Sequence, residues 1–293
     1  MAASSCKNSD ISFPDYEYSA VYFSNQTPIR TIELGEDYDV DNALDNEHKF
    51  RIGAAFGGSY DSKNVTVDFT VDESLCDGLF LDEACTIPVK PMPKEYYSLA
   101  SNQIKIDGDF KGFVEVSLNP AFFEDPVTCA SIDINTTPAK MMQMPLGCYV
   151  IPLRITGQSG VDKILSGEYS AETFPNGAPS RLETSSWEVA PRDYTLFAVN
   201  FMSKYSGVWL RSGKDDINGT ANDRSVVNKY TIDDEQIYLN TLGLKSVKMP
   251  VSYTFDPEQE AEKIDLVLTF DSDNGASANC TVSAPAGASY TVS

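Results

Sequence analysis

The chain has 293 residues, which corresponds to about two domains at a typical size of roughly 150 residues each. Its 22 basic residues are outnumbered by 43 acidic ones, for a formal net charge of −21. This balance argues against binding to nucleic acid or to an anionic membrane surface, because both require a basic face. A hydrophobic fraction of 42% is enough for packed cores, and a single histidine, His48, leaves little scope for histidine-dependent catalysis.

The amino terminus resembles the end of a bacterial lipobox. Small residues lead directly into Cys6, and Lys7 and Asp10 follow it. In a lipobox the cysteine is lipidated after cleavage, and the basic-then-acidic sequence resembles a signal that sends lipoproteins to the outer surface. We therefore expect residues 1–17 to be a lipoprotein tether, with the protein lipid-anchored to the outer membrane at the cell surface. The alternative is an ordinary cysteine near the start of a cytoplasmic protein.

The first half of the chain is dominated by period-two patterns typical of strands. In Val65–Val71, apolar and polar residues alternate, so the valines and Phe69 share one buried face. Turn signals between such segments indicate an immunoglobulin-like β-sandwich over residues 18–165, with a single helical turn at Pro120–Asp125. The predicted strands are Ala20–Phe23, Arg30–Leu34, Lys49–Ala55, Val65–Val71, Gln103–Ile106, Phe113–Leu118 and Tyr149–Ile155.

Residues 166–190 have a loop-rich composition, with clustered proline, glycine and asparagine, and are predicted to join two domains. A second series of strands follows, and its short turns favour an antiparallel β-barrel or sandwich over residues 191–293. The predicted fold class is therefore all-β. The strands of the second series are Tyr194–Met202, Gly207–Arg211, Ser225–Ile232, Gln236–Leu239, Val247–Phe255, Lys263–Phe270, Asn279–Ser283 and Tyr290–Val292.

Several runs carry a family resemblance: Val21–Gln26, Glu95–Leu99, Gly112–Val116, Ala121–Phe123, Tyr149–Ile155 and Tyr205–Trp209. Together they resemble uncharacterised two-domain surface lipoproteins that Bacteroidetes encode in glycan-utilisation loci. In some relatives the N-terminal domain precedes a family-18 glycosidase. The resemblance implies an accessory, cell-surface component with no established catalytic residues. It also implies an oligosaccharide or polysaccharide as partner, and an outer-membrane transporter complex.

The cysteines after Cys6 are placed where they could brace loops. Cys76 and Cys85 flank a turn-rich segment that one disulfide could close, and Cys129 and Cys148 bracket a longer one. Either disulfide would contribute about 2–4 kcal/mol. The sequence does not determine the pairing, and all could be buried free thiols.

No catalytic motif stands out in the sequence. The Asp-x-x-Asp-x-Asp-x-Glu run that a family-18 glycosidase requires is absent, as are a Gly-x-Ser-x-Gly elbow and a P-loop. Asp271–Gly275 resembles half of a calcium loop but lacks the closing glutamate, so a hairpin turn is the better interpretation. We expect a protein that is not an enzyme and needs no cofactor or metal.

A ligand site is predicted around Trp209. In a strand, Tyr205, Trp209 and Arg211 share one face, and an aromatic surface beside a guanidinium suits sugar hydroxyls or carboxylates. Trp187 could contribute from the join. The competing interpretation is that Gly207-Val208-Trp209 opens a lipocalin-like barrel, with these residues in its core.

The function expected from these features is a non-catalytic glycan-binding module of a polysaccharide-utilisation system. Two alternatives remain open. One is a barrel that binds lipid or another small hydrophobe, and the other is a structural subunit of a surface glycan-capture complex.

Overall fold

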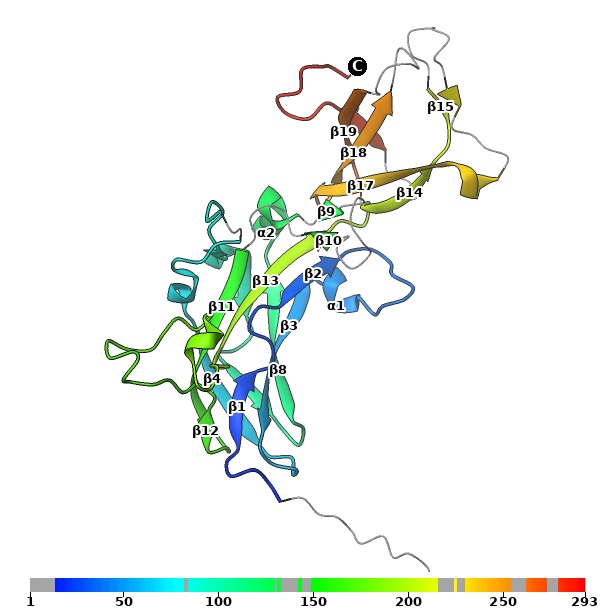
Figure 1. Ribbon diagram of the computed structural model, residues 1–293. Helices are drawn as coiled ribbons and strands as arrows, with labels where there is room; N and C mark the ends of the chain where they lie inside the picture. The colour runs from blue at the N-terminus through cyan, green and yellow to red at the C-terminus, as the bar shows by residue number, and fades with distance from the viewer. Residues whose placement is uncertain are drawn as a thin grey trace, which may run out of the picture.

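The computed structural model describes residues 14–81, 84–129, 131–132, 142–143, 149–215, 224–225, 230–253, 262–272 and 279–292. Figure 1 shows a large β-sandwich at one end of the molecule and a smaller curled sheet at the other. The α-helices of the described residues are single turns, α1 (Ala43–Asn46) and α2 (Pro120–Glu124), so the predicted all-β class is confirmed. Among these residues no helix is long and apolar enough to cross a membrane.

The first sheet of the sandwich has the strand order β12-β1-β3-β8-β6. Alternation along β1 buries Val21 and Phe23 and turns Tyr22 to the outer face, where it is half-buried. β12 pairs with β1 in parallel, so the segment that leads into the join forms one edge of this sheet. The strands are β12 (Lys163–Ile164), β1 (Ala20–Phe23), β3 (Lys49–Gly57), β8 (Lys111–Leu118) and β6 (Tyr97–Leu99).

The second sheet has the order β2-β13-β11-β4-β7, with β5 paired to β11. The sequence pattern places Tyr194–Met202 at the start of the second domain, whereas the structure places this strand, β13, between β11 and β2 of the sandwich. β13 is buried along nearly its whole length, which is typical of a central strand covered on both faces. The strands are β2 (Ile29–Glu33), β13 (Tyr194–Met202), β11 (Tyr149–Ser159), β4 (Val65–Val71), β7 (Gln103–Ile106) and β5 (Lys90–Pro91).

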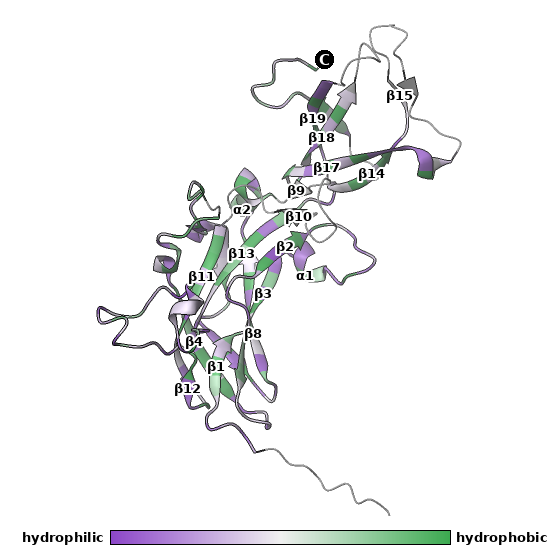
Figure 2. Ribbon diagram, in the orientation of Figure 1, coloured by the Kyte–Doolittle hydropathy of each residue, from purple (hydrophilic) through white to green (hydrophobic). Residues whose placement is uncertain are grey.

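One hydrophobic core fills the space between the two sheets, and Figure 2 shows the hydrophobic residues concentrated along these strands. Its fully buried members include Phe23, Ile32, Ile52, Val67, Ile104, Phe122, Leu153 and Phe201. The helical turn predicted at Pro120–Asp125 is confirmed as α2, which caps the core by packing Phe122 and Phe123 on Phe201. His48 packs on Phe123 with ring centroids 4.3 Å apart, so the histidine is a packing residue.

The second domain is an antiparallel meander in the order β14-β17-β18-β19-β20. Within the described part of the chain, β14 and β20 stay at the two ends of this order, and no pairing closes the sheet into a barrel. The strand expected at Ser225–Ile232 does not reach its predicted end, because a 3-10 turn occupies Thr231–Asp233; β16 (Arg224–Ser225) lies at its start, and residues 226–229 are outside the described residues. Residues 290–292 are not a strand. The meander consists of β14 (Gly207–Arg211), β17 (Glu235–Gly243), β18 (Ser246–Tyr253), β19 (Glu262–Phe270) and β20 (Cys280–Ser283).

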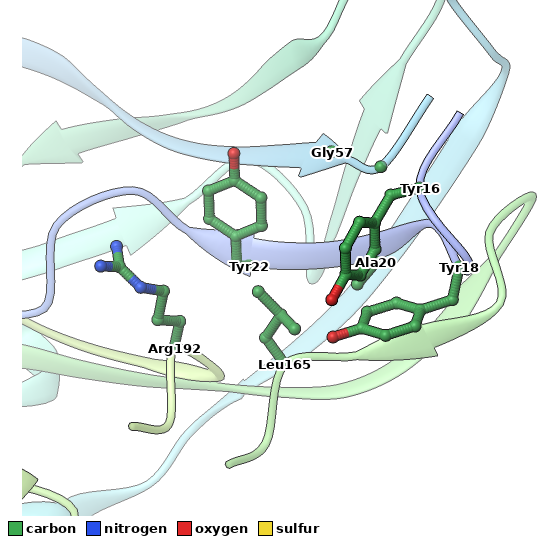
Figure 3. Close-up of a pocket in the computed structure, with 8 residues that line it drawn as sticks. Tyr16, Tyr18, Ala20, Tyr22, Gly57, Leu165 and Arg192 are labelled. Atoms are coloured by element: carbon green, nitrogen blue, oxygen red, sulfur yellow. The ribbon is translucent and has the colours of Figure 1, made fainter. Parts of the chain in front are cut away.

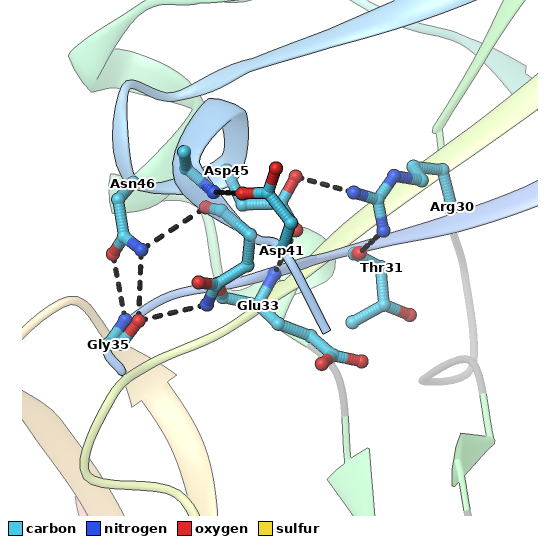
Figure 4. Close-up of polar contacts among 9 residues, drawn as sticks. Arg30, Thr31, Glu33, Gly35, Asp41, Asp45 and Asn46 are labelled. Carbon is cyan, nitrogen blue, oxygen red and sulfur yellow. Dashed lines mark hydrogen bonds and ion pairs between the residues drawn. The ribbon is translucent and has the colours of Figure 1, made fainter. Parts of the chain in front are cut away.

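The two domains meet through the turn that follows β2. Gly35 lies so close to Lys204 that a Cβ at Gly35 would be 2.7 Å from the Cβ of Lys204. Asn46 holds this turn, because its side chain accepts from the Gly35 amide and donates to the Gly35 carbonyl, at 2.9 Å each (Figure 4). The buried Asp45 carboxylate accepts from the side chain of Arg30. The turn is thereby fixed against the segment that enters the small sheet.

Candidate functional site

Three of the predicted site residues lie together at β14, an edge strand of the small sheet. Trp209 is paired across the ladder with Ile237, and Arg211 is paired with Glu235. Because these positions alternate with Val208 and Leu210, Trp209 and Arg211 share one face, as predicted. We call this surface the β14 face.

Trp209 is the exposed aromatic residue of the β14 face. Its side chain is 47% exposed, and its Nε1 donates a hydrogen bond of 3.1 Å to the carbonyl oxygen of Tyr205. Gly207 has a φ of +129°, a conformation that favours glycine, and the strand begins there. The ring is thus oriented by the main chain while much of its surface meets solvent, so little side-chain order is lost when a ligand binds.

Tyr205 lies beneath this surface instead of within it. The residue is buried, and its ring stacks on Phe270 with centroids 3.8 Å apart and an interplanar angle of 8°. Its hydroxyl donates to the carbonyl oxygen of Ser272. Together with Leu239 and Val247 it forms the small core of the second domain. Tyr205 therefore supports the site from below.

A pocket of about 330 Å³ lies beside Trp209. Lys204, Tyr205, Trp209, Leu239 and Phe270 line it. Its lining is mostly apolar, and the ammonium group of Lys204 lies 5.1 Å from the centroid of the Tyr205 ring. The strand pairing brings three of these residues together from separate segments, namely Lys204, Leu239 and Phe270. No local sequence signal therefore identifies them as pocket residues.

Arg211 supplies the polar part of the β14 face. Its Nη1 lies 2.7 Å from Oε2 of Glu235, and both side chains are partly exposed. A guanidinium next to a carboxylate offers hydrogen-bond donors and acceptors side by side. Sugar hydroxyls can use both at once.

Trp187 does not belong to this site. It is buried in the join, where its Nε1 donates to the carbonyl oxygen of Ser180 at 2.9 Å and its ring meets Tyr169 edge-on. A Cβ at Gly167 would lie 2.6 Å from the indole ring. The full length of β13 separates this part of the join from β14 (Figure 1). Trp187 is a packing residue of the join.

The cysteine pair expected to close a loop is not joined. Cys76 is a free, buried thiol, and Cys129 is also free and buried. Burial raises the pKa of the Cys76 thiol to about 11 and that of Cys129 to about 12. Cys6 and Cys148 lie outside the described residues. Among the side chains that the structure describes, no group of three or more His, Cys, Asp or Glu could hold a metal ion.

Two family models match the chain. One is described as a "-like, N-terminal domain" and covers residues 15–162, and the other is a domain of unknown function, DUF5627, at residues 204–293. No curated protein matches.

Solved structures are similar to the chain as a whole. A Bacteroides ovatus protein of unknown function is 35% identical, with a TM-score of 0.76, over 92% of this chain and 78% of that one. An auxiliary nutrient binding protein from Bacteroides thetaiotaomicron is 15% identical, with a TM-score of 0.40, over 89% and 70%. A multidomain protein including DUF1735 from Bacteroides ovatus is 12% identical, with a TM-score of 0.41, over 92% and 72%.

Proposed function

Because the chain belongs to a Bacteroidetes family of two-domain proteins that combine this N-terminal domain with DUF5627, we propose that it is a non-catalytic, glycan-binding accessory protein of a polysaccharide-utilisation system. The observation that carries the proposal is the half-exposed indole of Trp209, held in place beside a pocket and an Arg–Glu pair. This combination suits a sugar ring, because the sugar presents an apolar C–H face and a rim of hydroxyl groups.

In this proposal the sugar stacks its C–H face on Trp209. Hydroxyl groups at the rim then hydrogen-bond to Arg211 and Glu235, which lie on the same face. The ammonium of Lys204, at the pocket wall, supplies a further donor. Tyr205 and Phe270 keep the floor of the pocket rigid by stacking on each other.

A lipid-binding barrel is the second candidate, and the geometry favours it less. In a closed barrel the tryptophan of Gly207-Val208-Trp209 would seal the floor, whereas Trp209 is 47% exposed. The pocket of about 330 Å³ lies at the small end of the range of roughly 300–1,000 Å³ for drug-sized ligands. A third candidate, a structural subunit of a glycan-capture complex, is an outcome of the test below.

We also propose that Cys6 carries a lipid that anchors the protein to the outer membrane, facing outward next to a transporter complex. The resemblance to surface lipoproteins motivates this. The described chain begins at Pro14, at the end of the sandwich opposite the small sheet (Figure 1). A tether leaving there would hold the β14 face away from the membrane. Mass spectrometry of the native, full-length product tests the anchor, and an unmodified Cys6 would overturn it.

The binding proposal is tested by a glycan array together with displacement of a fluorescent fatty acid. We expect oligosaccharides to bind and the fatty acid not to. Trp209→Ala should abolish glycan binding, and Val208→Ala should leave it intact, since Val208 is exposed on the opposite face of the same strand. Fatty-acid binding would favour the barrel. If neither glycans nor the fatty acid bind and partner proteins co-purify, the structural subunit is favoured.

A further inference from the structure

A second aromatic cleft lies at the other end of the molecule, on the outer face of the first sheet. It has a volume of about 410 Å³. Its walls include Tyr16, Tyr18 and Tyr22 from the segment that enters β1, and Leu165 and Arg192 from the two ends of the join. Figure 3 shows Tyr16 and Tyr18 on one side of Leu165 and Arg192 on the other. We call it the tyrosine cleft.

Gly58, directly after β3, allows the segment that carries the tyrosines to approach β3 closely. A Cβ at the neighbouring Gly57 would be in ordinary van der Waals contact with the Tyr22 ring, at 3.5 Å. Gly58 has a φ of +91°, and a Cβ there would lie 2.1 Å from the carbonyl oxygen of Tyr18. The amide of Tyr16 donates to the carbonyl oxygen of Gly58 at 3.0 Å. The segment is therefore pinned against β3, and the rings of Tyr16 and Tyr18 meet edge-on with centroids 5.0 Å apart.

Arg192, whose main chain is held in place, adds a cation to the cleft. Its amide donates to the carbonyl oxygen of Leu165 at 2.7 Å, and its own carbonyl accepts from the amide of Phe23 at 2.9 Å. The side chain is exposed, and its guanidinium extends to the side of Tyr22 (Figure 3). The neighbouring carboxylate, Asp193, is already held by both nitrogens of the Arg181 fork.

Arg192 lacks a carboxylate partner, as does Arg51 among the described residues, but Arg192 also lines an aromatic cleft. Among the described residues no carboxylate lies within ion-pair distance of Arg192, although the chain carries 43 acidic residues. Other arginines have one: ion pairs join Arg30 to Asp45, Arg154 to Asp72, Arg181 to Asp193 and Arg211 to Glu235. A guanidinium left available beside three tyrosines is suited to a ligand that brings its own negative charge.

Lysines and carboxylates both surround the cleft: Asp15 accepts a hydrogen bond from the Tyr60 amide, and Glu17 stands between Tyr16 and Tyr18 in the sequence. Lys163 places its Nζ 3.4 Å from the centroid of the Tyr18 ring, and Lys63 contacts the hydroxyl of Ser19 at 3.3 Å. The carboxylate of Asp162 is engaged by the amide and hydroxyl of Ser19. Exposed charges farther than a Debye length of about 8 Å are largely screened at physiological salt, so these nearby groups dominate.

We propose that the tyrosine cleft is a second carbohydrate site, selective for a negatively charged sugar residue, either a uronic acid or a sulfated sugar. The inference rests on the proposed glycan-binding function and adds a ligand class to it. The tyrosine rings provide an apolar surface with polar hydroxyls, and the planar guanidinium can hold a carboxylate or sulfate in bidentate fashion. The cleft and the β14 face lie at opposite ends of the molecule, so they bind separate parts of a glycan (Figure 1).

The experiment compares matched acidic and neutral ligands by calorimetry on the full chain. The probes are oligogalacturonate and its methyl ester, and a sulfated oligosaccharide with its desulfated form. The variant is Arg192→Gln. Its control is Arg51→Gln, which removes the same charge from another exposed arginine, on β3.

We expect wild type to bind one acidic probe more tightly than its neutral counterpart, with an affinity that falls as salt is added. Arg192→Gln should weaken that binding about tenfold or more, as loss of a charge-assisted bidentate contact implies, and leave the neutral probe unaffected. Arg51→Gln should change neither. Comparing the affinity for oligogalacturonate with that for the sulfated probe shows whether the cleft prefers a carboxylate or a sulfate.

The outcomes separate this inference from the proposed function. If wild type binds neutral oligosaccharides through Trp209 but binds the acidic forms no better, the tyrosine cleft is not an anionic-sugar site and the β14 face stands. If Arg192→Gln and Arg51→Gln weaken binding of the acidic probe equally, the effect comes from the net charge of the protein alone, and the inference is overturned. If no glycan binds at all, both proposals fail.

Discussion

The indole of Trp209 is held by the main chain of Tyr205, through a hydrogen bond of 3.1 Å from Nε1 to the carbonyl oxygen. These two aromatic residues therefore have different roles. Trp209 lies on the surface with a fixed orientation, and Tyr205 stacks on Phe270 in the core beneath it. Loss of the Trp209 side chain should weaken ligand binding, and loss of the Tyr205 side chain should lower the stability of the fold.

The first prediction concerns the stability of these two positions. Tyr205→Ala should lower the free energy of unfolding by about 3–5 kcal/mol, the cost of deleting a buried ring. Trp209→Ala should lower it by about 1–2 kcal/mol, because the half-exposed ring buries much less apolar surface. Urea unfolding followed by tyrosine and tryptophan fluorescence measures both. If Trp209→Ala proves as costly as Tyr205→Ala, Trp209 is core and cannot be the sugar platform.

The second prediction tests the contact between the domains. Gly35→Ala should lower the free energy of unfolding by about 1–3 kcal/mol, because the new methyl group would overlap Lys204 and because alanine is strained at a φ of +105°. Gly177→Ala is the matched control, since Gly177 has a similarly positive φ of +127° but nothing within 4 Å of its would-be Cβ. The difference between the two variants in urea unfolding isolates the overlap. Equal losses would mean that the Gly35–Lys204 approach is not tight in solution.

Strand positions were predictable wherever apolar and polar residues alternate over a short stretch. β4, β7 and β14 begin and end where the pattern predicts, because period-two burial is encoded locally. The sequence of Ser225–Ile232 is rich in β-branched residues, yet the described end of this segment is not buried, since Ile232 is 81% exposed. Propensity alone does not make a strand.

Partner choice between strands was not predictable. β13 follows a loop-rich join, which is typical of a domain boundary, yet it inserts between β11 and β2 because its two apolar faces need cover on both sides. The same holds for the sites. Trp209 and Arg211 share a strand and could be placed together from spacing, whereas Arg192 reaches Tyr22 only through the packing of the join against β1.

The third prediction concerns pH. The carboxylate of Asp125 accepts hydrogen bonds from the hydroxyls of Tyr96 and Tyr149 at 2.9 and 3.0 Å and from the amide of Val127. Burial acts to raise the pKa of Asp125, but these hydrogen bonds outweigh it and hold the pKa below its ordinary 3.8. Burial and the bond to Asp125 raise the pKa of Tyr96 to about 12.

Since the folded pKa of Asp125 is depressed, its contribution to stability is present above pH 3.8 and is lost as the pH falls through the lower folded value. The contribution of Tyr96 is present below pH 10.0 and is lost as the pH rises through about 12. Asp125→Asn should cost about 1–3 kcal/mol at neutral pH and flatten both limbs of a plot of unfolding free energy against pH. If the pH dependence of the unfolding free energy is the same in Asp125→Asn as in wild type, the hydrogen bonds to Asp125 are not formed in solution.

The fourth prediction concerns the thiols. The loop that Cys76 and Cys85 flank is held without a disulfide, because Leu75, Leu79 and Val89 pack on the cluster that contains Cys76. The amide of Val89 also donates to the carbonyl oxygen of Leu79 at 2.9 Å. Non-covalent packing of this kind is the physical reason that the expected cross-link is not needed.

Alkylation of the native protein at pH 8 without reductant, with mass spectrometry to locate the modified sites, should therefore label the exposed Cys85 and Cys280 first. Cys76 and Cys129 should react only on unfolding. Both are buried, and with the pKa of Cys76 raised to about 11, about one molecule in a thousand carries the reactive thiolate at that pH. Denaturant supplies the control, since it should equalise the rates. Recovery of Cys76 and Cys85 as one cross-linked peptide would contradict the prediction and restore the disulfide.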